Sequence, residues 1–283
     1  MARRYDTISL LTDYGLTDEF VGVVKSVIRD LAPHVVTIDL THEVPPFDVR
    51  AGALALARCI PYVASGIVIA VVDPGVATDR AAVAVEVARG EGVLIGPDNG
   101  LLAPAVALAG GAERAVSLTN SAYQLPAPGP TFAGRDVFAP AAAHLANGVD
   151  LTDLGDLLDV DLLMPATVPL TRREGDAVVG EVLWVDHFGN AQLNIDPDEV
   201  EELGDRVRVT VGATRRVARR VTAFAMLGPG ELGLVVDSCG LLALALDQRS
   251  AADELRVAAG TEVRLGEPGD GENERGTPVA FRT

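Results

Sequence analysis

Short apolar runs alternate with segments of helical periodicity over about the first 165 residues of the chain. Residues 6–13 (DTISLLTD) and 66–73 (GIVIAVVD) are typical of buried strands, whereas residues 18–33 and 46–63 carry apolar side chains at helical spacing. Apolar strands that alternate with helices indicate a largely parallel sheet that is covered on both faces. We therefore expect an N-terminal α/β domain over residues 1–165.

The pattern changes after this point. Residues 166–177 combine prolines and charges without a clear period, which is typical of a linker. Residues 178–283 contain short strand-like runs separated by glycines and little helical pattern, so we expect a smaller C-terminal β-barrel or sandwich domain there. Its last segment, PVAFRT at 278–283, is compatible with an edge strand.

Charge and cysteine content narrow the possible partners. The formal net charge of −17 opposes nucleic-acid binding, and we interpret the basic cluster RRVARR at 215–220 as a solvated hairpin face. The longest apolar run, around 67–72, is far shorter than the roughly 18 residues that span a membrane. No signal-peptide cleavage site is expected near the N-terminus, and only Cys59 and Cys239 occur, without metal-type spacing. These features predict a cytoplasmic protein without a nucleic-acid or membrane partner.

Common catalytic motifs are missing. The sequence has no dinucleotide-binding glycine fingerprint and no phosphate-binding P-loop, and HEVPP at 42–46 is not a zinc-binding HExxH motif. Lys25 is the single lysine and a poor Schiff-base candidate. The histidines form no evident metal set, and we interpret them as structural residues: His34, His42, His144 and His187. We predict no metal site.

Acidic residues lie instead at the ends of predicted strands. Asp13 closes the first apolar run, Asp73 closes the run at 66–73, and Asp98 and Asn99 follow a further run. The carboxyl ends of parallel strands meet at one edge of a sheet and form its ligand crevice. A carboxylate there suits ribose hydroxyls or an ammonium group, so we expect a ligand site at this edge, although each Asp alone fits a turn or cap equally well.

The second domain has one comparable stretch, VDHFGNAQLN at 185–194. It places Asp186, Phe188 and Asn190 close to the end of a predicted strand. An aromatic ring and an amide together can stack on and hydrogen-bond a purine. The alternative is a β-turn with Phe188 folded into the core, and composition alone slightly favours that alternative.

Six segments together resemble the S-adenosyl-L-methionine (SAM) hydroxide adenosyltransferases, also called adenosine-forming SAM hydrolases, which are relatives of the SAM-dependent fluorinase and chlorinase. The segments are LLTDYGLTDEFVGVVKSVI, DLTHEVPPFDVRAGALAL, VVDPGV followed by Arg80, GPDNGLL, TFAGRD and HFGNAQLN, in order between about residues 7 and 250. The resemblance implies SAM as substrate, no cofactor, and a homotrimer whose active sites lie between one subunit's N-terminal domain and a neighbour's C-terminal domain.

The resemblance also implies roles for individual residues. In the first domain, Asp13 would bind the ribose hydroxyls, Asp18 would meet the methionine amino group, and Phe47 would pack near the ribose. In the second, Phe188 and Asn190 would bind adenine. The methionine end would be held by Asp186 and Ser238, while the implied roles of two further crevice residues are looser: Asn99 and Phe132.

The catalytic set implied by the resemblance is incomplete in this chain. The hydrolases use an aspartate, an arginine and a histidine around the attacking water, and Asp73 and Arg80 match the first two. The histidine belongs to TFHGRD, but this chain reads TFAGRD, with Ala133 at that position. Either the chain is an engineered histidine-to-alanine variant, which we favour, or it is a natural member that works without the histidine. In both cases we predict retained substrate binding and reduced turnover.

Two other functions stay open. One is a SAM- or adenosine-binding protein without catalysis. The other is a SAM-dependent halogenase, which Asp73 disfavours because the halogenating relatives carry an uncharged residue there and a carboxylate repels a halide. Without the resemblance, the residues indicate only an α/β nucleoside-binding enzyme.

Overall fold

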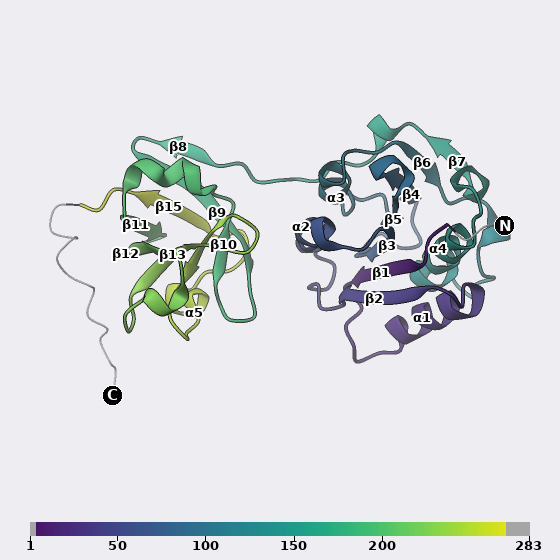
Figure 1. Ribbon diagram of the computed structural model, residues 1–283, viewed down its shortest axis with the longest axis horizontal. Coiled ribbons are helices and arrows are strands. Elements are labelled where there is room, and N and C mark those ends of the chain that lie inside the picture. The colour runs from purple at the N-terminus through teal and green to yellow at the C-terminus, as the bar shows by residue number, and fades with distance from the viewer. Residues whose placement is uncertain (1–3, 270–283) are drawn as a thin grey trace. The chain divides into compact units, whose positions relative to one another are not determined.

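The computed structural model describes residues 4–269 (Figure 1). The chain forms two compact units, the first ending at Thr167 and the second beginning at Val168. The first unit is an α/β domain and the second is a β domain, which confirms the fold class expected from the sequence. The predicted edge strand at 278–283 lies outside the described residues.

The first unit is built on a seven-stranded sheet with the order β2-β1-β3-β5-β4-β6-β7. Strands β2, β1, β3 and β5 are parallel, whereas β4, β6 and β7 pair antiparallel. The link between β4 and β5 is too short for a helical crossover and therefore makes a hairpin. The strands are β1 (Thr7–Thr12), β2 (Val36–Thr41), β3 (Gly66–Val71), β4 (Ala82–Val87), β5 (Gly92–Pro97), β6 (Arg114–Ser117) and β7 (Asp156–Leu158).

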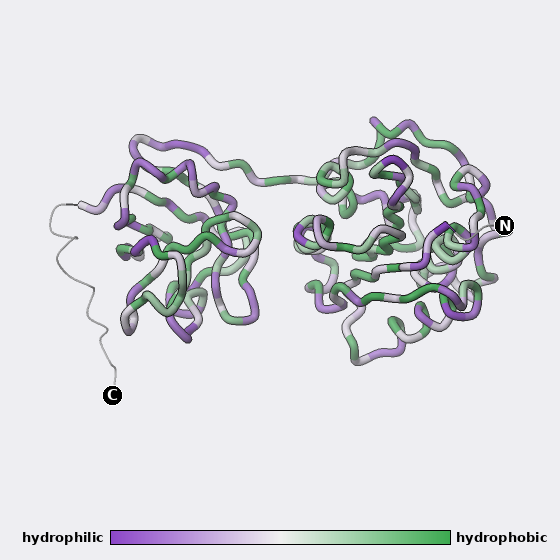
Figure 2. The backbone as a smooth tube through the Cα atoms, viewed as in Figure 1, coloured by the Kyte–Doolittle hydropathy of each residue, from purple (hydrophilic) through white to green (hydrophobic). Residues whose placement is uncertain are grey.

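Helices cover both faces of this sheet (Figure 1), as the continuous apolar character of its central strands requires. One core contains Ile8 and Leu10 of β1 with residues of α1 and α4, and the other contains Leu11 with residues of α2 and α3. β3 is buried along its whole length, and the central strands are mostly hydrophobic in Figure 2. The helices are α1 (Phe20–Leu31), α2 (Val49–Cys59), α3 (Ala103–Leu108) and α4 (Ala139–Ala146).

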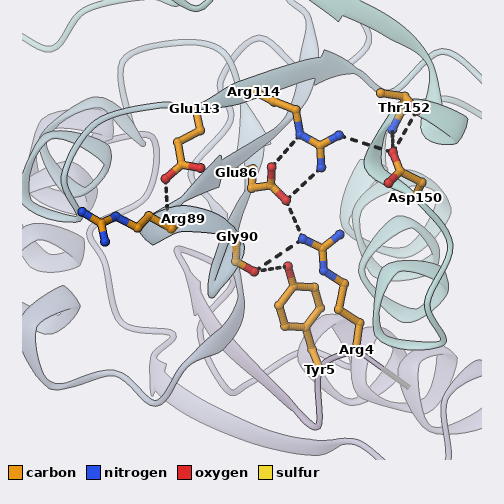
Figure 3. Close-up of polar contacts among 9 residues, drawn as sticks. All are labelled: Arg4, Tyr5, Glu86, Arg89, Gly90, Glu113, Arg114, Asp150 and Thr152. Carbon is orange, nitrogen blue, oxygen red and sulfur yellow. Dashed lines mark hydrogen bonds and ion pairs between the residues drawn. The ribbon is translucent and has the colours of Figure 1, made fainter. Parts of the chain in front are cut away.

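A cluster of ion pairs lies at the edge of this sheet where β1 begins (Figure 3). The side chain of Glu86, at the end of β4, is only 6% exposed and accepts hydrogen bonds from Arg4 at 2.6 Å and from Arg114 of β6 at 2.6 Å. Arg114 also lies 3.5 Å from Asp150. The buried carboxylate thus joins the segment before β1 to two strands of the sheet.

The second unit is a closed barrel of seven strands in the order β10-β14-β13-β12-β11-β15-β9, sealed by pairing between β9 and β10, with β8 added beside β9. Valine and leucine side chains from these strands and the short helix α5 (Ala251–Leu255) form its core. The strands are β8 (Arg172–Glu174), β9 (Ala177–Val185), β10 (Ala191–Leu193), β11 (Arg206–Val211), β12 (Thr214–Val221), β13 (Leu232–Val236), β14 (Leu242–Ala245) and β15 (Glu262–Gly266).

Two details of the second unit differ from the sequence-based expectation. Residues 172–174 were placed in the linker but form β8, which pairs with β9 as a short hairpin. The basic cluster at 215–220 lies on β12, in a hairpin with β11, but it is not simply solvated, because Arg219 pairs with Glu231 at 2.8 Å and Arg216 with Glu254 at 3.4 Å. Over residues 4–269, no helix combines the length and apolar character needed to cross a membrane.

Candidate active site

The carboxyl ends of three adjacent strands, β1, β3 and β5, bring together Asp13, Asp73 and Asn99. Thr12 pairs with Val71, and the Asp13 amide donates to the Val71 carbonyl at 3.3 Å. The Asn99 side chain donates to the Val72 carbonyl at 2.9 Å and accepts from the Leu101 amide at 3.2 Å. Asn99 therefore holds the end of β3 in place, immediately before Asp73.

Asp73 and Arg80 form a buried charge pair at this edge. The Arg80 Nε donates to both carboxylate oxygens at 2.9 Å, and Nη2 donates to Oδ2. Only 5% of the Asp73 side chain and 14% of the Arg80 side chain are exposed. The guanidinium also lies over the Phe138 ring, 5.6 Å from its centroid. The carboxylate and the guanidinium are therefore fixed in orientation, and both charges are available to a reacting molecule at this edge of the sheet.

Asp13 is linked to Phe47 through the backbone. The Phe47 amide donates to Asp13 Oδ2 at 2.9 Å, and Phe47 has the left-handed φ of 68°, which is costly for a bulky residue. Phe47 is 72% exposed, so the strained turn presents an aromatic side chain to solvent. Asp18 is exposed in the loop between β1 and α1.

Phe132, which the sequence analysis placed at the crevice, belongs to an aromatic cluster next to Asp13 whose other members, Tyr14 and Phe20, it did not identify. The Tyr14 ring is 5.8 Å from Phe132 and 5.7 Å from Phe20, measured between centroids. Burial raises the pKa of the Tyr14 hydroxyl, and the Asp13 and Asp73 carboxylates raise it further, so the phenol stays neutral. Its position directly after Asp13 in the sequence is the signal that places it at the same sheet edge.

Ala133 lies beside this aromatic cluster, immediately before a single π-helical turn, Gly134–Phe138, that leads into α4. It is half-buried and packs against the core of the first unit. A Cβ atom on Gly134 would collide with the Tyr14 hydroxyl, so this hydroxyl approaches the backbone at 134 closely. The methyl group of Ala133 adds no polar atom to this region.

The second unit has a pocket of about 450 Å³ that includes Phe188 and Asn190. Phe188 is 76% exposed, so the alternative in which its ring folds into the core is wrong. Sequence analysis missed the other side of the pocket, which is formed by Phe224 and residues 246–250. An aromatic ring, an amide and this volume suit a flat heteroaromatic ligand such as a purine.

Asp186 organises the loop that carries these residues. Its carboxylate accepts hydrogen bonds from the Phe188 amide at 2.9 Å and from the Asn190 backbone and side-chain amides, both at 2.8 Å. Gly189 has a φ of 84° and packs so closely on Ser250 that a Cβ atom would collide with it. The loop is therefore locked against the segment that forms the other side of the pocket.

Ser238 is exposed in the turn between β13 and β14 and is not among the residues that line the pocket. Asp237 holds this turn by accepting from the Cys239 amide at 2.8 Å and the Leu241 amide at 3.2 Å. Within residues 4–269, no group of three or more His, Cys, Asp or Glu side chains is placed to hold a metal ion.

Comparisons with known proteins identify relatives along almost the whole chain. The SAM hydroxide adenosyltransferase N-terminal domain matches residues 8–155, and the corresponding C-terminal domain matches residues 180–264. The chain is 46% identical over 258 residues to the (R)-S-adenosyl-L-methionine hydrolase of Salinispora tropica, covering 91% of this chain and 97% of that protein. It is 42% identical to the hydrolase of the same name from Thermus thermophilus over 91% of this chain and 98% of that protein.

A more distant relative and a solved structure are also similar to this chain over most of its length. A fluorinase from an Actinoplanes species is 28% identical over 91% of this chain and 96% of that protein. The crystal structure of an uncharacterized conserved protein from Thermotoga maritima superposes with a TM-score of 0.84 at 35% identity, covering 92% of this chain and all of that one. The chain belongs to the SAM hydroxide adenosyltransferase family.

Proposed function

We propose that this protein hydrolyses SAM to adenosine and L-methionine. The observation that carries the proposal is the buried Asp73–Arg80 pair at the carboxyl edge of β3, beside Asp13, in a chain that is 46% identical to a SAM hydrolase. A carboxylate at this position favours neutral water over a halide ion as the attacking group, because like charges repel most strongly where solvent is excluded.

The reaction is a displacement at the ribose C5′ atom. The oxygen of water forms a bond to C5′ while the C5′–S bond breaks. The electron pair of the broken C5′–S bond stays on sulfur, which neutralises the sulfonium and gives the thioether of methionine. Asp73 accepts a hydrogen bond from the attacking water and receives its proton, which then passes to solvent. Arg80 fixes the Asp73 carboxylate and stabilises hydroxide character on the water. Because the leaving group is already cationic, placement and water activation are the main requirements.

The remaining residues supply binding in this proposal. Asp13 holds the ribose hydroxyls, with the exposed Phe47 ring beside it, and Asp18 meets the methionine amino group. Phe188 and Asn190 bind adenine, while Asp186 and Ser238 serve the methionine end. The two sets of residues meet between neighbouring subunits of a homotrimer, and the reaction needs no cofactor. The enzyme acts in the cytoplasm, where Cys59 and Cys239 stay reduced.

Product analysis tests the reaction. The protein and its Ala133→His variant are incubated with SAM, with and without chloride or fluoride, and adenosine, methionine and 5′-halo-adenosine are quantified by chromatography. We expect adenosine and methionine in equal amounts from both, with the variant faster by about 10²–10⁴-fold, the usual contribution of a general acid–base group.

Other outcomes separate the alternatives. SAM that binds both proteins but is cleaved by neither indicates a binding protein. Halide-dependent formation of a 5′-halo-adenosine indicates a halogenase. A turnover that is unchanged by Ala133→His contradicts the assigned cost of the missing histidine.

A further inference from the structure

A buried histidine outside the proposed catalytic set contacts Thr12, the residue immediately before Asp13. His42 follows β2, and its side chain is 3% exposed. Its Nδ1 is 2.8 Å from the Thr12 hydroxyl at the end of β1, and its Nε2 is 3.2 Å from Asp39 Oδ1, within ion-pair distance although not aligned as a hydrogen bond. Lys25 of α1 contacts the other oxygen of Asp39 at 2.9 Å.

With a neutral imidazole, the charge on Asp39 favours one arrangement of donors and acceptors in this chain of contacts. Burial raises the pKa of the Asp39 carboxyl, but Lys25 and His42 lower it by more, so Asp39 is an anion and draws the imidazole N–H to Nε2. Nδ1 is then an acceptor and receives the Thr12 O–H. The Thr12 oxygen keeps lone pairs free, and it accepts a hydrogen bond from the Tyr14 amide at 3.2 Å.

This chain of contacts fixes the backbone on both sides of Asp13. The Thr12 hydroxyl holds the amide of Tyr14, and the His42 carbonyl accepts from the Gly15 amide at 2.8 Å. The loop that begins at His42 continues to Phe47, whose amide binds the Asp13 carboxylate. The backbone before and after Asp13 therefore depends on where His42 lies. The same holds for the Phe47 amide, which orients the Asp13 carboxylate.

A nucleophilic role for the Thr12–His42–Asp39 set does not fit this geometry. Thr12 is 3% exposed, and its hydroxyl is occupied by His42 and by the Tyr14 amide. A nucleophile must reach the substrate, and this oxygen faces the protein interior. The set resembles a catalytic triad in its residue types but acts on the backbone.

We propose that Thr12 and His42 are positioning residues that orient Asp13 for the ribose hydroxyls of the substrate. The proposal deepens the proposed function and rests on it. Losing one of these hydrogen bonds misplaces the Asp13 carboxylate and weakens binding of any ligand that carries an adenosine ribose. It leaves the Asp73–Arg80 pair intact, so KM rises while kcat changes little.

Adenosine affinity by calorimetry, together with KM and kcat for SAM, tests the proposal. We expect Thr12→Val and His42→Ala to raise the adenosine Kd and the KM about 10-fold each, the equivalent of one hydrogen bond, with kcat within about twofold. Thr12→Ser keeps the hydroxyl and His42→Asn keeps an acceptor near Nδ1, so both restore the Kd to within about threefold. Thr7→Val, at the other end of β1, is the matched control and stays at the wild-type Kd.

The outcomes distinguish this proposal from the proposed function. A lower melting temperature with unchanged Kd and KM in Thr12→Val and His42→Ala means a purely structural role and overturns the proposal. If Thr12→Val or His42→Ala does not fold, Thr12→Ser and His42→Asn decide, because an adenosine Kd raised about 10-fold in both also contradicts the proposal. A wild type that binds adenosine but does not cleave SAM removes the reaction and leaves the Kd comparison valid. A wild type that binds no adenosine overturns both.

Discussion

Phe47 carries its ring on a backbone conformation that glycine adopts more readily. Its φ is 68°, and because the residue is 72% exposed, its side chain contributes little buried area to folding. We expect Phe47→Gly to be more stable than Phe47→Ala by about 1 kcal/mol, because alanine keeps the strain and lacks the ring. Both variants bind adenosine more weakly than the wild type. Urea unfolding and calorimetry measure the two effects, and an alanine variant at least as stable as the glycine variant would refute the strain.

Arg80 is expected to be irreplaceable by lysine. The guanidinium donates to both oxygens of Asp73 from one planar group, whereas an ammonium binds as a point charge. Arg80→Lys should therefore lower kcat for SAM hydrolysis by about 10²-fold and leave the adenosine Kd within about threefold. Arg29→Lys, at the exposed end of α1, is the control and keeps the wild-type kcat. A wild-type kcat in Arg80→Lys would show that a planar guanidinium is not needed to orient Asp73.

The position of a residue could be predicted from the sequence where its side chain directly follows a strand. It could not be predicted where contacts between distant segments determine it. The positions of Asp13 and Asp73 follow from apolar runs and the rule for parallel strands. The exposure of Phe188 does not, because only the closure of the barrel shows that its loop lies beside residues 246–250. The contact between His42 and Thr12 is equally hidden, because the two residues are 30 positions apart in the sequence and a lone buried histidine carries no sequence signal.

At the scale of elements, the order of strands determines which side chains meet. The apolar runs of β1, β3 and β5 were identifiable because strands buried on both faces read as continuous hydrophobic segments. β8 was missed because its three residues, Arg172–Glu174, are all polar and exposed and show no alternation. Pairing with β9, rather than any preference of its own, makes this segment a strand.

Glu86 makes the stability of the first sheet depend on pH. Hydrogen bonds from Arg114 lower the pKa of its carboxyl more than burial raises it, and Arg4 lowers it further. A depressed carboxyl pKa contributes stability above its unfolded value, about 4.5, and this contribution is lost as the pH falls through the lower folded value. Glu86→Gln should therefore destabilise the protein by about 2 kcal/mol at pH 7 and by progressively less below pH 4.5.

Thermal or urea unfolding of the wild type and Glu86→Gln across pH 3–7 measures this difference. Glu91→Gln, an exposed carboxyl near the same edge, is the matched control and should change stability little at any pH. A difference between wild type and Glu86→Gln that stays constant down to pH 3 would show that the carboxylate charge is not the source of the effect.

For the whole molecule, the sequence pattern already separates the two units. The change from alternating strands and helices to short strands alone marks the division near residue 166, and each unit has its own hydrophobic core. The sequence could not show which strands close the barrel, because the pairing of β9 with β10 depends on a register set by three-dimensional packing.

Separate cores and divided binding residues lead to one prediction for the molecule as a whole. Residues 1–167 and 168–283, produced separately, should each unfold cooperatively, because each unit buries its own apolar side chains. Neither should release adenosine from SAM, since Asp13, Asp73 and Arg80 lie in one unit and Phe188 and Asn190 in the other. Chromatography of the products, with the full chain as control, measures this. Turnover by the first unit alone would place the complete site in the α/β domain and remove the purine-binding role of the barrel pocket.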